Sequence, residues 1–225
     1  NFQHIPVKGA FSGVVVTNEK EIGYALGVVG NQDFRAGGEL GTDGGAWSRV
    51  SRGPWFTRWG ELPPDLGLAG ASLVIDFELK QQEEKVVRFI LAWYSPNWKG
   101  GGAPMTGGNT YTHMYASRYR NALEVARFLA ANHESLLSRI LAWQQVVYTE
   151  KKMPTWLRES LVNILHLITE DSFWAQAKPP IGKWCRPEDG LFGMSECPRG
   201  CPQIENIPSS FYGTNAIAYF FPQLA

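Results

Sequence analysis

The run Ser12-Gly13-Val14-Val15-Val16-Thr17 sets the character of the first half of this 225-residue chain. Residues branched at Cβ favour strands, and three further runs of this kind follow at 22–30, 71–79 and 85–93. Glycines, prolines and charged residues separate the runs, and such residues suit turns and long surface loops. The first half is therefore predicted to be antiparallel β structure.

The third run has the alternation of a half-buried strand. One face carries only apolar residues and the other carries two carboxylates; the apolar face holds Leu73, Ile75, Phe77 and Leu79. We expect this apolar face to pack on a second sheet. The charged segment 80–85 that follows is predicted to be the solvated end of a hairpin.

The second half changes to the period of helices. After a glycine-rich stretch at 99–108, apolar residues recur at helical spacing from about Ser117, which predicts one long helix or two in series ending near Tyr148. A further helix is predicted to start at Pro154, a residue suited to a first turn, and to bury an apolar stripe. The apolar segment 211–225 predicts a buried helix, and its uncapped end is interpreted as a truncation.

These patterns predict a multidomain β + α protein. The expected parts are a partial antiparallel β-sandwich at 1–98, a linker at 99–116, a linker helix or helices at 117–150, and the start of a helical domain at 151–225.

Composition excludes several classes of protein. Lys plus Arg and Asp plus Glu are both 21, so no positive surplus is available to attract nucleic acid. No apolar run approaches the length of a membrane span. The chain lacks a secretory type of start and an initiator Met, so it is interpreted as beginning inside a longer protein, and the missing leader says little about location. Nine Trp and eight Tyr supply rings on which sugars can stack, although the same rings also fill cores.

The cysteines, Cys185, Cys197 and Cys201, lie in one short stretch. Their odd number argues against a pure disulfide framework and favours a reducing compartment, so a cytoplasmic location is slightly favoured. A zinc site at Cys197 and Cys201 is the less favoured alternative to simple thiols, because the spacing is loose and no His lies nearby. No cofactor motif is present, and no metal is expected.

The segment 183–212 is rich in Pro, Gly and Cys and is predicted to be a loop that presents binding residues. It contains Glu188, Asp189, Glu196 and Glu205. Carboxylates of this kind can cleave a glycosidic bond, one attacking the anomeric carbon while another protonates the leaving oxygen. A single loop carboxylate is more often solvated, and sequence alone does not pair them. The four His are scattered, and His166 is predicted to be a packed core residue.

Several motifs in order resemble glycoside hydrolase family 116, which includes the non-lysosomal glucosylceramidase and bacterial β-glucosidases. The resemblance spans roughly residues 90–225, whereas the earlier strands match only in character. Its motifs are Leu91-Ala-Trp-Tyr-Ser-Pro-Asn-Trp98, Tyr115-Ala-Ser-Arg-Tyr119, Met153-Pro-Thr-Trp-Leu157, Thr169-Glu-Asp-Ser-Phe-Trp174, Phe192-Gly-Met-Ser-Glu196 and Phe220-Phe-Pro-Gln-Leu224.

The resemblance implies a β-sandwich followed by the first helices of an α/α toroid, and a carbohydrate or glycolipid substrate. It places the catalytic nucleophile at Glu196, with Glu205 as the runner-up carboxylate, and substrate-binding positions at Ser209, Ser210 and Tyr212. It places the acid/base and the remainder of the toroid beyond the end of this chain. The sequence departs from the family pattern at Cys197, where a glycine is usual, and at Pro208 to Ser210, where an Asp or His is usual.

The resulting prediction is a retaining glycoside hydrolase that cleaves β-linked glycosides through a covalent glycosyl-enzyme intermediate. A non-catalytic carbohydrate-binding or structural protein of the same architecture is the alternative, suggested by the lost polar residues at 208–210. A third, less favoured hypothesis is an interaction module that uses exposed apolar helices.

Overall fold

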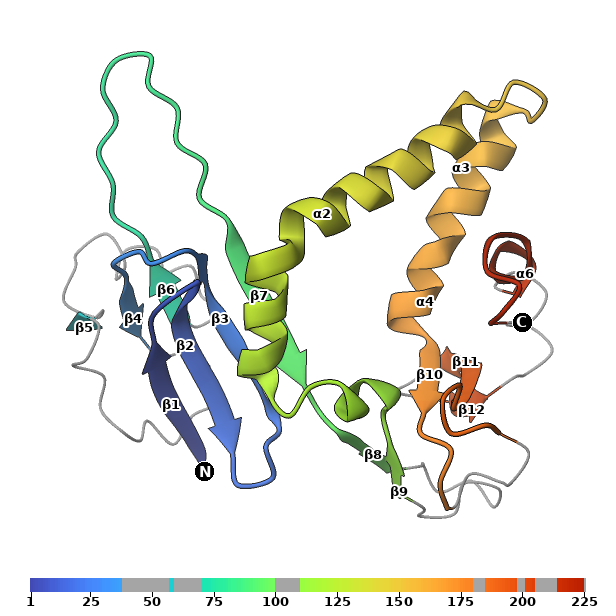
Figure 1. Cartoon of the computed structure of the whole chain (residues 1–225), viewed down its shortest axis with the longest axis horizontal. Coiled ribbons are helices and arrows are strands. Elements are labelled where there is room, and N and C mark those ends of the chain that lie inside the picture. The colour runs from blue at the N-terminus through green and yellow to red at the C-terminus, as the bar shows by residue number, and fades with distance from the viewer. Residues whose placement is uncertain are drawn as a thin grey trace. The chain divides into compact units, whose positions relative to one another are not determined.

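The computed structural model describes residues 1–37, 57–58, 70–99, 110–179, 185–197, 201–204 and 214–224. At 57–58, 99, 195–197 and 201–204 the description covers the backbone alone. The described residues form antiparallel sheets and a few helices, which confirms the predicted mixture of β and α structure (Figure 1).

The chain divides into two compact units. The first comprises residues 1–96 and 119–133, and the second comprises 97–118 and 134–225. Both ends of the predicted linker, 99–116, thus fall in the second unit.

The first unit is built on a four-stranded antiparallel sheet with the order β1-β2-β3-β7. Its strands are β1 (Phe2–Val7), β2 (Phe11–Asn18), β3 (Gly23–Val29) and β7 (Phe89–Tyr94). The runs predicted around Ser12 and at 22–30 therefore form the centre of the sheet. β1 occupies an edge, where Pro6, which has no N–H to donate, is tolerated.

Burial explains why the central strands form. Val14 and Val16 of β2 are completely buried, as is Val28 of β3. β7 alternates strictly between exposed and buried residues, so the sheet has two different faces at this edge. The ring of His4 on β1 is also buried, and its Nε2 lies 3.0 Å from the carbonyl oxygen of Gly70.

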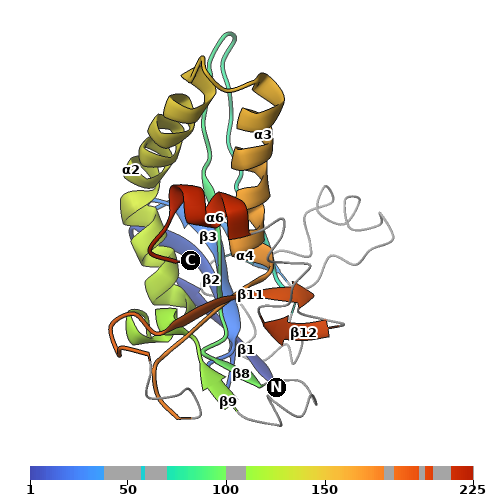
Figure 2. The ribbon, with the colours of Figure 1, turned by 90° about the vertical axis from the view of Figure 1, so that its right-hand side faces the viewer.

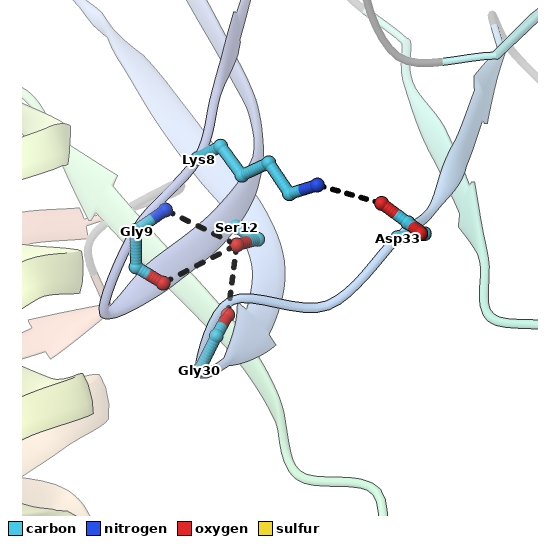
Figure 3. Close-up of polar contacts among 5 residues, drawn as sticks. All are labelled: Lys8, Gly9, Ser12, Gly30 and Asp33. Carbon is cyan, nitrogen blue, oxygen red and sulfur yellow. Dashed lines mark hydrogen bonds and ion pairs between the residues drawn. The ribbon is translucent and has the colours of Figure 1, made fainter.

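A buried hydroxyl ties together the turns at one end of this sheet (Figure 3). Ser12 Oγ donates to the carbonyl of Gly30 at 2.7 Å and lies 3.3 Å from both the nitrogen and the carbonyl oxygen of Gly9. Because Ser12 is fully buried, these backbone partners replace the water it loses on folding. Lys8 and Asp33 form an exposed ion pair beside these turns, with Nζ and Oδ1 separated by 2.6 Å.

A small second sheet has the order β5-β4-β6. It consists of β4 (Arg35–Gly37), β5 (Thr57–Arg58) and β6 (Ser72–Val74). The strand predicted at 71–79 thus ends at Val74; Phe77 and Leu79 beyond it are exposed. A turn forms at 80–85, where the backbone nitrogen of Glu83 donates to the carbonyl of Lys80, but it is not the predicted hairpin end, because β6 pairs with β4 and β7 pairs with β3.

Arg35 of β4 pairs with Asp76, at the start of the segment 75–88 that connects β6 to β7. Its Nε and Nη2 donate to the two carboxylate oxygens of Asp76 at 2.7 and 2.8 Å. The paired guanidinium lowers the pKa of Asp76. Bidentate pairing fixes the geometry more than a single contact would.

The predicted long helix is confirmed as α2 (Ala122–Thr149). Its first half belongs to the first unit and buries the small residues Ala122, Ala126 and Ala130. Tyr94 of β7 donates its hydroxyl to the carbonyl of Tyr119 at 2.9 Å, just before the helix. Within the described ranges, no helix has both the length and the apolar character that a membrane span requires.

The second unit begins with a hairpin of β8 (Asn97–Lys99) and β9 (Thr110–Thr112), followed by the short helix η1 (Met114–Ser117). After the second half of α2 come α3 (Thr155–Asn163), η2 (Ile164–His166) and α4 (Leu167–Glu170). α3 begins directly after Pro154, which confirms the predicted helix start to within one residue. The last described helix is α6 (Asn215–Phe220).

A three-stranded antiparallel sheet follows α4, with the order β10-β11-β12. Its strands are β10 (Ser172–Ala175), β11 (Leu191–Cys197) and β12 (Cys201–Ile204). β11 separates two small cores: Met194 packs with Leu167 of α4 and Ile217 of α6, while Leu191 packs against the buried Phe173 and Ala175 of β10. Figure 2 shows α6 beside the α3–α4 segment, above this sheet.

Three predictions are wrong in this unit. The segment 183–212 is not a continuous loop, because β11 and β12 form within it. His166 is exposed rather than packed in a core; its Nδ1 lies 2.7 Å from the carbonyl oxygen of Asn163. The helix predicted over 211–225 is only α6 among its described residues, and Tyr219 within it is 60% exposed.

Candidate functional site

A tight turn leads into β11 and forms the wall of a cavity. The carbonyl of Arg186 accepts from the backbone nitrogens of Asp189 and Gly190. Gly190 has a φ of +66°, which L-residues rarely adopt. A Cβ at this position would lie 2.3 Å from the carbonyl oxygen of Ala175, so glycine is required for space as well as for conformation.

The cavity has a volume of about 710 Å³. It lies in the second unit and combines aromatic side chains with charged groups. It is lined by Trp174, Cys185, Arg186, Glu188, Asp189, Gly190, Leu191, Phe192, Gln223 and Leu224.

Trp174 is held by its polar edge. Its indole nitrogen donates to the carbonyl of Asp189 at 2.7 Å, and its ring meets Phe192 edge to face. The side chain is still 37% exposed. Since the N–H is already satisfied within the protein, what remains for a ligand is the apolar surface of the ring.

The charged groups of the cavity differ in their contacts. Arg186 donates from Nε to Asp189 Oδ2 at 2.6 Å, and its Nη2 lies 2.5 Å from the same oxygen. The charge of Asp189 is therefore largely matched within the turn. Glu188, next to it, is exposed and makes none of the ion pairs found among the described residues.

A second cavity of about 500 Å³ adjoins the same turn. Glu188 is a lining residue of both cavities. The other lining residues are Met114, Ser117, Gln176, Ala177, Lys178 and Pro187.

His113 lies in an aromatic cluster near these cavities. It forms an isolated β-bridge with Ala175, and its ring stacks on Tyr115 with centroids 5.3 Å apart. The edge of the ring also meets Phe173. Burial lowers the pKa of His113, and a hydrogen bond with the Trp174 backbone only partly opposes this effect. The imidazole is therefore neutral at pH 7.

Glu196, the predicted nucleophile, lies at an irregularity in the β11–β12 pairing. Ser195 pairs with Ile204, and Cys197 pairs with Cys201. Two residues of β12 therefore lie opposite the single residue Glu196, which is the count of a β-bulge. Pro202, one of those two, has no N–H for a regular ladder.

The other predicted site residues, Glu205, Ser209, Ser210 and Tyr212, lie outside the described residues. The side chain of Glu196 is likewise not described. Among the described side chains, no group of three or more His, Cys, Asp or Glu is placed to hold a metal ion.

Sequence reasoning missed Trp174, Arg186 and His113 as members of this region. The turn did leave a signal, because Arg186-Pro-Glu-Asp-Gly190 has the Pro, Asp and Gly typical of a tight turn. For His113 there was no signal, since its surroundings come from β10, about 60 residues later. No protein-family model matches the chain.

Proposed function

We propose that this chain belongs to a retaining glycoside hydrolase that acts on β-linked sugars and that Glu196 is its nucleophile. In this proposal the first unit is part of a β-sandwich, and the helices of the second unit open an α/α toroid. The ordered motifs between residues 90 and 225 are the sequence support for it.

The backbone at Glu196 is the observation that supports the proposal most. Bulges occur often beside active sites, where they turn a side chain away from the regular alternation of a strand. A nucleophilic carboxylate has to be aimed at one carbon atom, so a local break in the ladder next to Glu196 is a suitable setting.

The larger cavity and Glu196 lie at different ends of β11. Phe192 borders the cavity and stands four residues before Glu196, a separation of about 13 Å along an extended strand. The carboxyl groups of a retaining pair are only about 5–5.5 Å apart. The cavity at the start of β11 therefore suits a neighbouring part of a substrate, such as a further sugar or an aglycone, rather than the bond that is cleaved.

In the proposed reaction, the Glu196 carboxylate attacks the anomeric carbon while a separate acid protonates the departing oxygen. The glycosyl ester that results is then hydrolysed by water, which the same acid, now a base, deprotonates. The exposed face of Trp174 would contact the apolar face of a sugar ring.

Covalent labelling tests this proposal. The complete natural protein is incubated with 2-deoxy-2-fluoro-β-glycosides that carry a good leaving group, because the fluorine slows hydrolysis of the ester. Peptide mass mapping should then find one sugar on Glu196. Glu196→Gln should lose the label, and Glu188→Gln, which removes an exposed carboxylate eight residues before Glu196, should keep it.

The same experiment separates the alternatives. A label on Glu205 would keep the enzyme class and move the nucleophile. No label with gluco, xylo and N-acetylglucosamine configurations, together with sugar binding that Glu196→Gln leaves unchanged, would replace this proposal by the non-catalytic carbohydrate-binding protein.

A further inference from the structure

Two of the three cysteines are brought opposite each other by the fold. Cys197 is the last residue of β11 and Cys201 the first residue of β12, and the two are Cα partners in the antiparallel pair. Only three residues of the sequence separate them. The hairpin thus closes on a cysteine pair.

This register satisfies the main distance requirement of a disulfide. Directly opposed residues of antiparallel strands have Cα atoms roughly 4.5–5.5 Å apart. Disulfides join Cα atoms that are usually about 4.4–6.8 Å apart. Two cysteines in this relation can be linked without moving the strands.

The third cysteine differs in both position and reactivity. Cys185 precedes the turn that leads into β11, lines the larger cavity, and is a free thiol among the described side chains. Desolvation raises the pKa of the Cys185 thiol. Since the thiolate is the form that reacts, this shift lowers the fraction of Cys185 that is available for disulfide exchange.

We propose that Cys197 and Cys201 are a redox-modification site, at which a cross-strand disulfide closes the β11–β12 hairpin. The co-reactant is a small-molecule disulfide such as oxidised glutathione. One protein thiolate attacks a sulfur of this disulfide and expels a thiolate; the second protein thiolate then attacks the mixed disulfide and expels the other. The protein loses two electrons and two protons, and the small-molecule disulfide becomes two thiols.

The site has a consequence for the backbone next to it. The irregular pairing that surrounds Glu196 begins at the Cys197–Cys201 pair. A disulfide there fixes the Cys197–Cys201 register on the turn side of this irregular region, whereas in the reduced hairpin only the backbone pairing and the three-residue connection fix it. This consequence does not depend on whether Glu196 is a nucleophile.

Peptide mapping tests the site directly, because Arg199 stands between the two cysteines. The complete folded protein is equilibrated with oxidised glutathione, its remaining thiols are alkylated, and it is then digested with trypsin. Cleavage after Arg199 leaves Cys197 and Cys201 on different peptides, so only a disulfide keeps these peptides together. The expected product is a linked pair whose mass is the sum of the two reduced peptides, less two hydrogens and plus the one alkyl group on Cys185. Reductant should separate the two peptides.

One ambiguity needs a control. Trypsin cleaves after Lys183 and does not cleave between Arg186 and Pro187, so Cys185 and Cys197 share a peptide. Fragmentation of the linked pair in the unmodified protein identifies the bonded cysteine, and Cys185→Ser should retain the link completely. Cys201→Ser should abolish it, with circular dichroism confirming that both variants fold.

Two results would overturn the proposal. One is alkylation of both Cys197 and Cys201 after equilibration with excess oxidised glutathione. The other is a linked pair in which Cys185, rather than Cys197, is bonded to Cys201. Neither result bears on the sugar label at Glu196, so this inference and the proposed function can fail separately.

Discussion

The sheet β1-β2-β3-β7 and the sheet β10-β11-β12 are both antiparallel, yet they are built from different residues. β2 buries six consecutive residues, including three valines, and has no reactive side chain apart from the bonded Ser12. β11 contains Gly, Met, Ser, Glu and Cys within seven residues. The first sheet is rich in residues that favour strands, whereas the second has few of them and depends more on what packs against it.

Because of this difference, the first sheet serves as structural support, whereas the second sheet carries the candidate site. In the second sheet, β11 is fixed through Met194, which packs on α4 and α6, and through Leu191, which packs on β10. Its other positions are left for residues that do not favour strands. Because other elements hold β11 in place, its pairing with β12 can be irregular at Glu196. A strand of regularly paired valines would not allow this irregularity.

The largest effect should come from a charge in the first sheet. Val14 is fully buried, so Val14→Asp places a carboxylate where nothing can hydrate it, and we expect a loss of about 4 kcal/mol or more in the free energy of unfolding. Hydrogen exchange should then show the first unit open. Val86→Asp, at a side chain that is 71% exposed, is the matched control and should change stability by less than about 0.5 kcal/mol. Equal effects of the two substitutions would show that the valines of β2 are not what holds this sheet.

A smaller effect is expected at the turn before β11. Gly190→Ala adds a methyl group 2.3 Å from the Ala175 carbonyl oxygen at a residue whose φ is +66°. The conformation alone costs roughly 1–2 kcal/mol, and the contact forces the turn to move, so we expect about 3 kcal/mol in total.

Gly30→Ala isolates the conformational part. Gly30 also has a positive φ, +88°, but nothing lies within 4 Å of its missing Cβ. Urea unfolding should give it a loss of only about 1 kcal/mol. If the two variants were equally unstable, close packing of the turn against β10 would not be a feature of the second sheet.

The same contrast explains what the sequence could predict. β2, β3 and α2 have strong local patterns, and all three form close to their predicted bounds. The strand at 71–79 is shorter than predicted, because Phe77 and Leu79 have the alternation of a buried strand and yet remain exposed. Alternation shows that a strand is possible, and a partner surface decides whether it forms.

The candidate site was predictable only in part. The resemblance marks Glu196, but the Pro, Gly and Cys around it are typical of a loop, and they concealed a hairpin that is stabilised by residues from α4 and α6. His166 has apolar neighbours in sequence and is nevertheless exposed, because η2 turns its side chain away from the core formed by Leu167. Trp174 is placed by a hydrogen bond to Asp189, fifteen residues later, which no local pattern reveals.

The smallest effect concerns pH and again distinguishes the second unit. Burial among Tyr115 and Phe173 lowers the pKa of His113 in the folded protein below its unfolded value of about 6.5. As the pH falls below about 6.5, the unfolded chain binds a proton that the folded chain does not, so the free energy of unfolding decreases until the lowered folded pKa is reached. Above about 6.5 this contribution is complete and constant.

His113→Phe keeps a ring in the cluster and should remove the pH dependence of unfolding in this window, measured by urea titration at a series of pH values. His166→Phe, which replaces an exposed imidazole in the same unit, should leave the dependence in place. If the free energy of unfolding of His113→Phe still decreases as the pH falls below about 6.5, another group is responsible. The burial of His113 would then not be a cost that the packing of the second unit has to offset.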